Sequence, residues 1–229
     1  MTTAQYVDAK YYQAATPRSV GERLTVIARD RIYAKFLECC RPAATDTILD
    51  VGVSDVINDA ANVMERKYPY PRRITAAGIG QAAAFRAEFP DVGYAPIEAN
   101  KPLPFGDRAF DIATSNAVLE HVGGRDKQLL FVREMLRVAR RVFITVPNRF
   151  FPFEHHTAIP FMHYGDASFA VACGWLNKSE WADENNLVLM SKARLASLMP
   201  AGIDARIGYT GLALGPCSSN LYVFAGDVN

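Results

Sequence analysis

The chain has 229 residues, half of them hydrophobic, and 25 Lys and Arg residues against 24 Asp and Glu residues give a net charge of +1. A chain of this length can bury its own core, so we expect a single domain, residues 1–229. The balanced charge gives no reason to expect nucleic acid or an anionic membrane as a partner. No run approaches the ~20 apolar residues that cross a bilayer, so no membrane span is expected.

Cysteine content and the N-terminus predict a cytoplasmic location. Cys39, Cys40, Cys173 and Cys217 have neither the spacing of a metal knuckle nor the density of a small secreted scaffold, so we expect reduced thiols. The first residues contain no apolar core of signal-peptide length.

Residues 1–42 are expected to form an N-terminal helical cap. Apolar residues recur at helical spacing from Val20 to Phe36, between a Ser19–Glu22 capping box and Pro42.

Strand-like and helix-like runs then alternate. Strands are predicted at 47–51, 73–79, 92–97, 109–116 and 141–146, and helices at 55–68, 82–89 and 125–139.

This alternation predicts a doubly wound, Rossmann-like α/β fold with a mostly parallel sheet. Residues 148–186 interrupt it with an aromatic and histidine-rich segment, which we expect to shape an acceptor pocket. Asn177 and Glu180 resemble a second capping box, and a helix is predicted at 191–202. Residues 204–211 and 219–226 are expected to form an antiparallel pair at the sheet edge, for seven strands in all.

The turn after the first strand, Asp50 to Ser54, is the first candidate site. In an open α/β sheet the ligand lies outside the carboxyl ends of the strands, and Gly52 allows the backbone to approach it. An Asp-x-Gly turn alone is equally consistent with a purely structural turn.

More specific motifs follow in "LPFGDRAFDIATSNAVLEHV" (103–122), "REMLRVARRVFITVPN" (133–148) and "PNRFFPFEHHTAIPFMH" (147–163). In their order they resemble the class I methyltransferases that depend on S-adenosylmethionine (SAM), of the methyltransferase type 11-like branch. The last motif resembles a subgroup often found near polysaccharide and other small-molecule biosynthesis. The resemblance implies SAM as the cofactor.

The resemblance also implies positions for the cofactor. Asp50, Gly52 and Val53 would lie at the methionine end, and Gly78, Gly80 and Gln81 at the ribose. Ala99, with Glu98 and Asn100, would face the adenine, and Ser115 and Asn116 the sulfonium. Glu120 and His121 would begin the next helix close to the methyl donor.

Two departures from the family pattern affect this site. Ser54 and Val56 stand where further glycines are usual, and Gln81 stands near the position of the acid that grips the ribose hydroxyls. Loss of one charge-assisted hydrogen bond costs roughly 1.5–3 kcal/mol, or about ten- to a hundredfold in affinity. We expect weakened but not abolished SAM binding.

Methyl transfer to a hydroxyl requires positioning and removal of a proton, for which histidine is suited near neutral pH. The catalytic candidates are His121, His155 and His156, with Glu154 as an orienting acid or alternative base. His155, His156 and His163 lack a further ligand at fixed spacing, so no metal site is expected.

We therefore expect methyl transfer from SAM to a small-molecule or saccharide-linked acceptor, at oxygen. The alternative is a catalytically degenerate methyltransferase-like scaffold or binding subunit, favoured by the two departures. A nicotinamide dehydrogenase needs a G-x-G-x-x-G turn and a ribose acid, which this sequence lacks. The oligomeric state is left open, with a homodimer among the alternatives.

Overall fold

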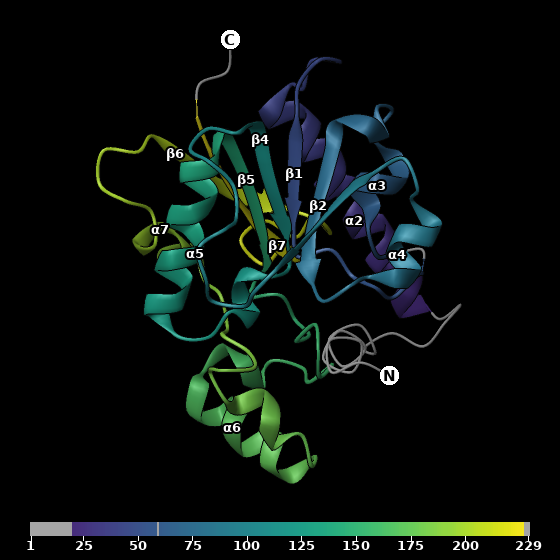
Figure 1. Ribbon diagram of the computed structural model, residues 1–229. Helices are drawn as coiled ribbons and strands as arrows, with labels where there is room; N and C mark the ends of the chain where they lie inside the picture. Colours follow the sequence, from purple (N-terminus) through teal and green to yellow (C-terminus); the bar gives the residue numbers. More distant parts are fainter. Residues whose placement is uncertain (1–19, 59, 227–229) are drawn as a thin grey trace.

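The computed structural model describes residues 20–58 and 60–226, and a seven-stranded sheet forms its centre (Figure 1). The strand order is β3-β2-β1-β4-β5-β7-β6. The strands are β1 (Ile48–Val51), β2 (Ile74–Ile79), β3 (Gly93–Ile97), β4 (Phe110–Asn116), β5 (Ala139–Pro147), β6 (Ala205–Thr210) and β7 (Asn220–Ala225). The helices are α2 (Val20–Cys40), α3 (Val63–Lys67), α4 (Ala83–Glu88), α5 (Arg125–Val138), α6 (Asp166–Trp175) and α7 (Lys192–Ser197).

Strands β3, β2, β1, β4 and β5 are parallel to one another, whereas β7 runs antiparallel to both β5 and β6. The predicted α/β fold and antiparallel edge pair are therefore confirmed. The central strands β1, β4 and β5 are buried over most of their length because helices cover both of their faces.

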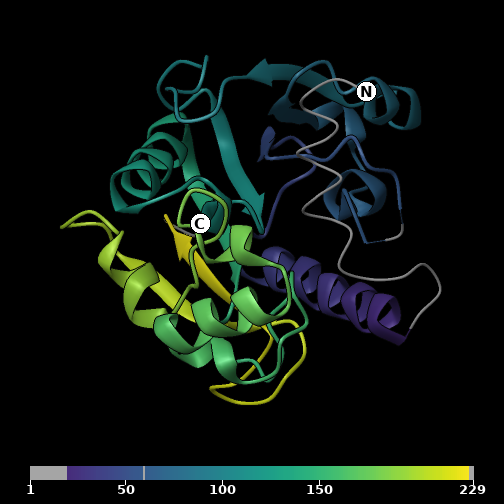
Figure 2. The ribbon, with the colours of Figure 1, turned by 90° about the horizontal axis from the view of Figure 1, so that it is seen from below.

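Two hydrophobic cores lie on opposite faces of the sheet. On one face Phe36 of α2 packs edge-to-face against Phe143 of β5, and Phe85 of α4 joins the same core. On the other face Val132 and Met135 of α5 pack against the sheet. Figure 2, seen from below, shows α2 and α5 on opposite sides.

Two predicted helices are shorter than expected. The helix predicted at 55–68 begins only at Val63, because Asn62 adopts a left-handed conformation (φ 52°) and the described residues before it, 54–58 and 60–62, are irregular. The helix predicted at 191–202 ends at Ser197. The Asn177–Glu180 capping box is also wrong, since Lys178 precedes the short 3-10 helix η4 (Ser179–Ala182) and no side chain caps it.

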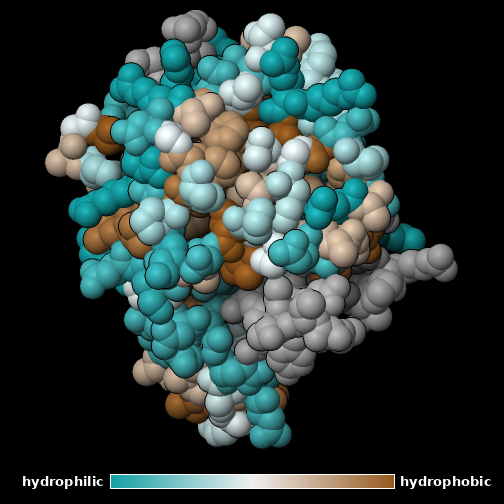
Figure 3. Space-filling model, in the orientation of Figure 1, coloured by the Kyte–Doolittle hydropathy of each residue, from teal (hydrophilic) through white to brown (hydrophobic). Residues whose placement is uncertain are grey.

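The segment 148–186 forms a lobe beyond the carboxyl ends of the parallel strands, drawn in green at the bottom of Figure 1. It contains η3 (Met162–Tyr164), α6 and η4, and a small core of its own that includes Phe169, Cys173 and Trp181. In Figure 3 hydrophobic residues reach the surface at the tip of the lobe, and Trp175 of α6 is 77 % exposed.

Among the described helices, none has the length and apolar character needed to cross a membrane.

Candidate functional site

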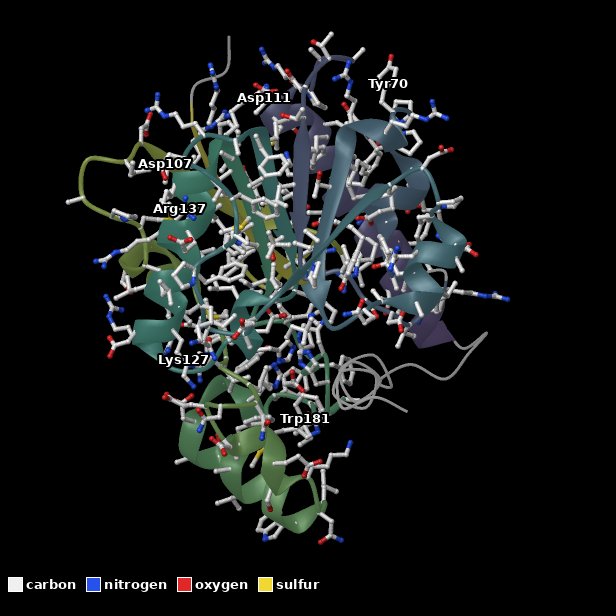
Figure 4. The ribbon with its side chains drawn as sticks, in the orientation of Figure 1. Tyr70, Asp107, Asp111, Lys127, Arg137 and Trp181 are labelled. Atoms are coloured by element: carbon white, nitrogen blue, oxygen red, sulfur yellow. The ribbon has the colours of Figure 1, made fainter. Side chains whose placement is uncertain are left out.

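The candidate site lies where the lobe meets the carboxyl ends of β1 and β4. Figure 4 shows Trp181 at this junction, whereas Tyr70 and Asp111 lie at the opposite edge of the sheet. Parallel strands bring their carboxyl ends to one edge, so the turn after β1 and the turn after β4 are neighbours.

Gly52 makes the turn after β1. Its φ of +96° favours glycine, and a Cβ at this position would collide with the side chain of Val118 in the turn after β4. Its N–H donates to the Ala77 carbonyl (2.7 Å), which ties the turn to β2. The sequence therefore requires glycine here for close packing as well as for backbone conformation.

The loop that follows satisfies its polar groups internally. The Ser54 N–H donates to Asn62 Oδ1 (2.9 Å), and Asn62 Nδ2 donates back to the Ser54 carbonyl (2.8 Å). The Val56 N–H donates to Ser54 Oγ, and Asp55 Oδ1 accepts from the Phe85 N–H. Ser54 is fully buried and closes this loop, which is the structural role of the residue that replaces a glycine.

A cavity of about 50 Å³ adjoins this turn. Its lining includes Arg29, Asp50, Gly52, Val53, Asn62, Thr114 and Asn116. Arg29 projects from α2, and its Nη1 is buried without a hydrogen-bond partner among the described residues. Since buried charged groups are normally paired, this guanidinium is a candidate for an anionic ligand group.

Asp50 lines the cavity together with Arg29, and Glu65 adjoins Asp50. Burial raises the pKa of Asp50 from its ordinary 3.8 to about 7, partly offset by Glu65 and by the charge of Arg29. Burial, and then the neighbouring Asp50, raise the pKa of Glu65. The cavity thus places the carboxyl group of Asp50 and the guanidinium of Arg29 in one wall, where they complement a ligand group that carries both a positive and a negative charge.

The other cofactor candidates are more dispersed. Asn116 lines the cavity, but the Ser115 hydroxyl donates to the Val51 carbonyl (2.8 Å) and so holds β1 to β4. Gly78 and Gly80 lie at the end of β2, and Gln81 lines a separate surface depression beside α4. The loop Glu98, Ala99 and Asn100 is exposed after β3.

Three of the four catalytic candidates meet in what we call the histidine cluster, Glu120, His121, Glu154 and His156. Glu154 Oε2 accepts from the Thr157 N–H (2.6 Å), the Thr157 hydroxyl (2.7 Å) and the His156 N–H (2.9 Å), and Oε1 lies 2.8 Å from His156 Nδ1. Burial alone would raise the pKa of Glu154, but these hydrogen bonds lower it to about 2.

The two imidazoles meet through their Nε2 atoms, which are 3.0 Å apart. His121 Nδ1 lies 2.7 Å from the Asn186 carbonyl, and the ring of Trp181 stacks on His156 with 5.1 Å between centroids. Although burial lowers the pKa of His156, the Glu154 carboxylate outweighs it and the net pKa is raised. The carboxylate and the stacked indole fix the His156 ring in one orientation.

Glu120 follows β4 in the short 3-10 helix η2 (Leu119–His121), and its side chain is 1 % exposed. Burial raises its pKa to about 7, against the charges of His156 and Arg29. Gly52 and Asn116 line the cavity, and Val118, two residues before Glu120, packs against Gly52, so the cavity and the histidine cluster are adjacent.

His155 and His163 lie apart from the cluster's ligand atoms. Burial and the charge of His156 lower the pKa of His155 to about 4, and its ring packs beside Phe151. His163 Nε2 lies 2.8 Å from the Phe151 carbonyl, which indicates a structural role.

Sequence reasoning missed Arg29 and Glu65. Each lies on a helix, where a charged residue in an amphipathic pattern looks like part of the solvated face. The only sequence feature that could have indicated a site residue was the acidic Glu65 at an inward-facing position of a predicted helix.

Comparisons with known proteins agree with this architecture. Residues 49–142 match the family model of the methyltransferase domain. No curated protein sequence matches the chain.

Solved structures show the same fold over nearly the whole chain. A SAM-dependent methyltransferase of Aquifex aeolicus is 15% identical and has a TM-score of 0.53, covering 95% of this chain and 97% of that one. A Thermotoga maritima methyltransferase, described as a possible histamine N-methyltransferase, is 15% identical with a TM-score of 0.55, covering 97% and 99%. A Pyrococcus horikoshii protein is 10% identical with a TM-score of 0.60, covering 99% of each chain.

The structural likeness shows the fold, and the residues that match the family model include Asp50, Gly52, Glu120 and His121, whereas Glu154 and His156 lie beyond the match. Together they show the fold of SAM-dependent methyltransferases over nearly the whole chain and a match to the methyltransferase domain over residues 49–142.

Proposed function

We propose that the chain is a SAM-dependent methyltransferase that transfers the methyl group of SAM to an oxygen of a small-molecule or saccharide-linked acceptor. The observation that carries the proposal is the adjacency of a charged cavity at the end of β1 and a buried histidine cluster at the end of β4. The cavity would hold the cofactor, and the cluster would receive the acceptor.

The cavity fits the amino acid end of SAM. The α-carboxylate would pair with Arg29 Nη1, which has no other partner among the described residues, and the α-ammonium would face Asp50 and Glu65. Because the cavity holds only about 50 Å³, the nucleoside would lie along the open edge toward Glu98 and Asn100. Gly52 permits the close approach of the backbone.

The sulfonium of SAM supplies an already activated methyl group, so the chain must orient the acceptor and remove its proton. The histidine cluster offers bases for that proton on His121, His156 and Glu120. Glu154 holds the His156 ring through Nδ1, in the way that an orienting carboxylate fixes a catalytic imidazole. The lobe covers this side and restricts the entry of water.

The test is release of S-adenosylhomocysteine (SAH) from SAM with a panel of sugars, nucleotide sugars, phenols and primary amines, followed by NMR of the product. We expect turnover with a hydroxylated acceptor and an O-methyl product. His121→Asn and His156→Asn should lower kcat by about 10²–10⁴. The matched control His163→Asn, in the same segment, should keep wild-type kcat. Turnover with amines alone would overturn the assignment to oxygen.

A further inference from the structure

We propose that Glu120, His121 and His156 form a binding site for a divalent transition-metal ion. One ligand atom from each of the three side chains lies within 4.8 Å of the other two. Glu120 and His121 follow β4, whereas His156 comes from the lobe, so an ion here would join the lobe to the sheet.

Hydrogen bonding fixes which nitrogen each imidazole presents. His121 Nδ1 faces the Asn186 carbonyl, which has no proton to donate, so Nδ1 carries the hydrogen. His156 Nδ1 faces Glu154, whose four contacts are those of an ionised carboxylate, so this Nδ1 also carries the hydrogen. Carbonyl and carboxylate partners on Nδ1 are the usual support of histidines that bind a metal through Nε2.

The spacing of the two Nε2 atoms suits one shared ion. Two imidazole nitrogens that bind one ion at about 2.1 Å are separated by about 3.0 Å at an octahedral angle of about 90°, and by about 3.4 Å at the tetrahedral angle usual for Zn²⁺. The observed distance is 3.0 Å. A cation between the rings would replace the single proton that this contact otherwise holds.

Glu120 supplies an independent reason to expect a cation. Both of its carboxylate oxygens are buried without a hydrogen-bond partner among the described residues, and Oε1 lies 3.9 Å from His121 Nε2. An unpaired buried carboxylate is costly, and an ion beside the two Nε2 atoms would pair it.

The ligand set selects the class of ion. Two imidazoles and one carboxylate suit Mn²⁺, Co²⁺ or Zn²⁺, whereas Mg²⁺ and Ca²⁺ prefer oxygen ligands. With the ion bound, Glu120, His121 and His156 would not be free to accept the acceptor's proton. Three protein ligands leave positions open, and the ion would instead lower the pKa of an acceptor hydroxyl bound there. Only this catalytic role rests on the proposed function, since the site itself is inferred from the ligand atoms.

Trp181 provides a direct reporter of the site, because its ring stacks on His156. The chain has two tryptophans, and Trp175 is exposed, so Trp175→Phe leaves Trp181 as the only one. In this background, without a histidine tag and after chelator treatment, we would titrate Co²⁺ and follow Trp181 fluorescence. Equilibrium dialysis with Zn²⁺ would give the stoichiometry.

We expect saturable quenching and one Zn²⁺ per chain. Binding should weaken at least tenfold in Glu120→Gln and in His156→Asn, and about 10–100-fold in Glu154→Gln, which only positions His156. His163→Gln is the matched control and should bind as wild type, with circular dichroism to verify the fold of each variant.

If the wild-type chain, freed of metal by chelator treatment, binds neither Zn²⁺ nor Co²⁺, the proposed site is overturned, whatever the variants show. Equal affinity in folded Glu120→Gln and His156→Asn would also overturn it. Metal binding without methyl transfer would retain the site and reject the proposed function, so the two proposals fail separately.

Discussion

At the scale of single residues, Asp50 and Glu65 bury two carboxyl groups side by side, and this arrangement predicts a pH dependence of stability. Burial raises the pKa of Asp50 from 3.8 to about 7 and also raises that of Glu65. The folded chain therefore keeps protons that the unfolded chain releases. The stabilising contribution is complete below about pH 4 and is lost as the pH rises toward 7.

We expect Glu65→Gln, which cannot ionise, to reduce this loss. The difference between the thermal midpoints of the variant and the wild type should shift in favour of the variant by about 2–4 °C from pH 5 to pH 8. For a chain of this size that shift corresponds to about 1 kcal/mol. Thermal unfolding at several pH values measures the difference. Exposed Glu88→Gln is the control and should follow wild type. A constant difference across the range would mean that Glu65 titrates normally.

The site residues that could be predicted from the sequence lie in local motifs, whereas those that were missed reach the site only through the packing of distant segments. Gly52 and Asp50 stand next to a strand end, so local pattern located them. Arg29 reaches the same cavity from α2, more than twenty positions away in the chain, and only the packing of α2 on the sheet brings it there. Glu154 and His156 were found from one short motif, but their contact with His121 depends on the fold of the lobe.

At the scale of elements, most predicted bounds lie within two residues of the observed ones, and the main failures are the helices predicted at 55–68 and 191–202. The bounds of α5 and β4 differ from the prediction by one residue, because each has a buried face that fixes its period. The helix predicted at 55–68 fails because Ser54 and Asn62 pair with one another and close a loop where the helix would begin. Side-chain hydrogen bonds to the backbone compete with a helix start in this way.

Helix α7 gives a prediction at this scale. It has six residues, and the Ser191 hydroxyl caps it by accepting from the Arg194 N–H at 3.1 Å. So short a helix depends on its cap and on the buried Leu195. Ser191→Ala should destabilise the chain by about 1 kcal/mol and lower its thermal midpoint by about 2–4 °C. Ser191→Asp, which restores an acceptor, should recover most of the loss; equal loss in both would exclude the cap as the cause.

At the scale of the whole molecule, cofactor binding should connect α2 to the sheet through Arg29. A ligand that binds only the folded chain stabilises it by about 2.7 kcal/mol at a hundredfold excess over Kd. SAH at that concentration should therefore raise the thermal midpoint of wild type by about 5–10 °C. The scaffold alternative predicts no shift, because a chain that no longer binds the cofactor gains nothing from it.

Arg29→Met tests the same connection from the protein side. It keeps the apolar stem of the side chain but removes the guanidinium, and loss of a hydrogen bond to a charged group costs roughly 1.5–3 kcal/mol, or about ten- to a hundredfold in SAH affinity. At the same SAH concentration the stabilisation should fall to about 0.4–1.4 kcal/mol. Arg23→Met, at an exposed position of α2, is the matched control and should keep the full shift. An undiminished shift in Arg29→Met would place the carboxylate of the cofactor away from α2, and the cavity beside Asp50 would then have another occupant.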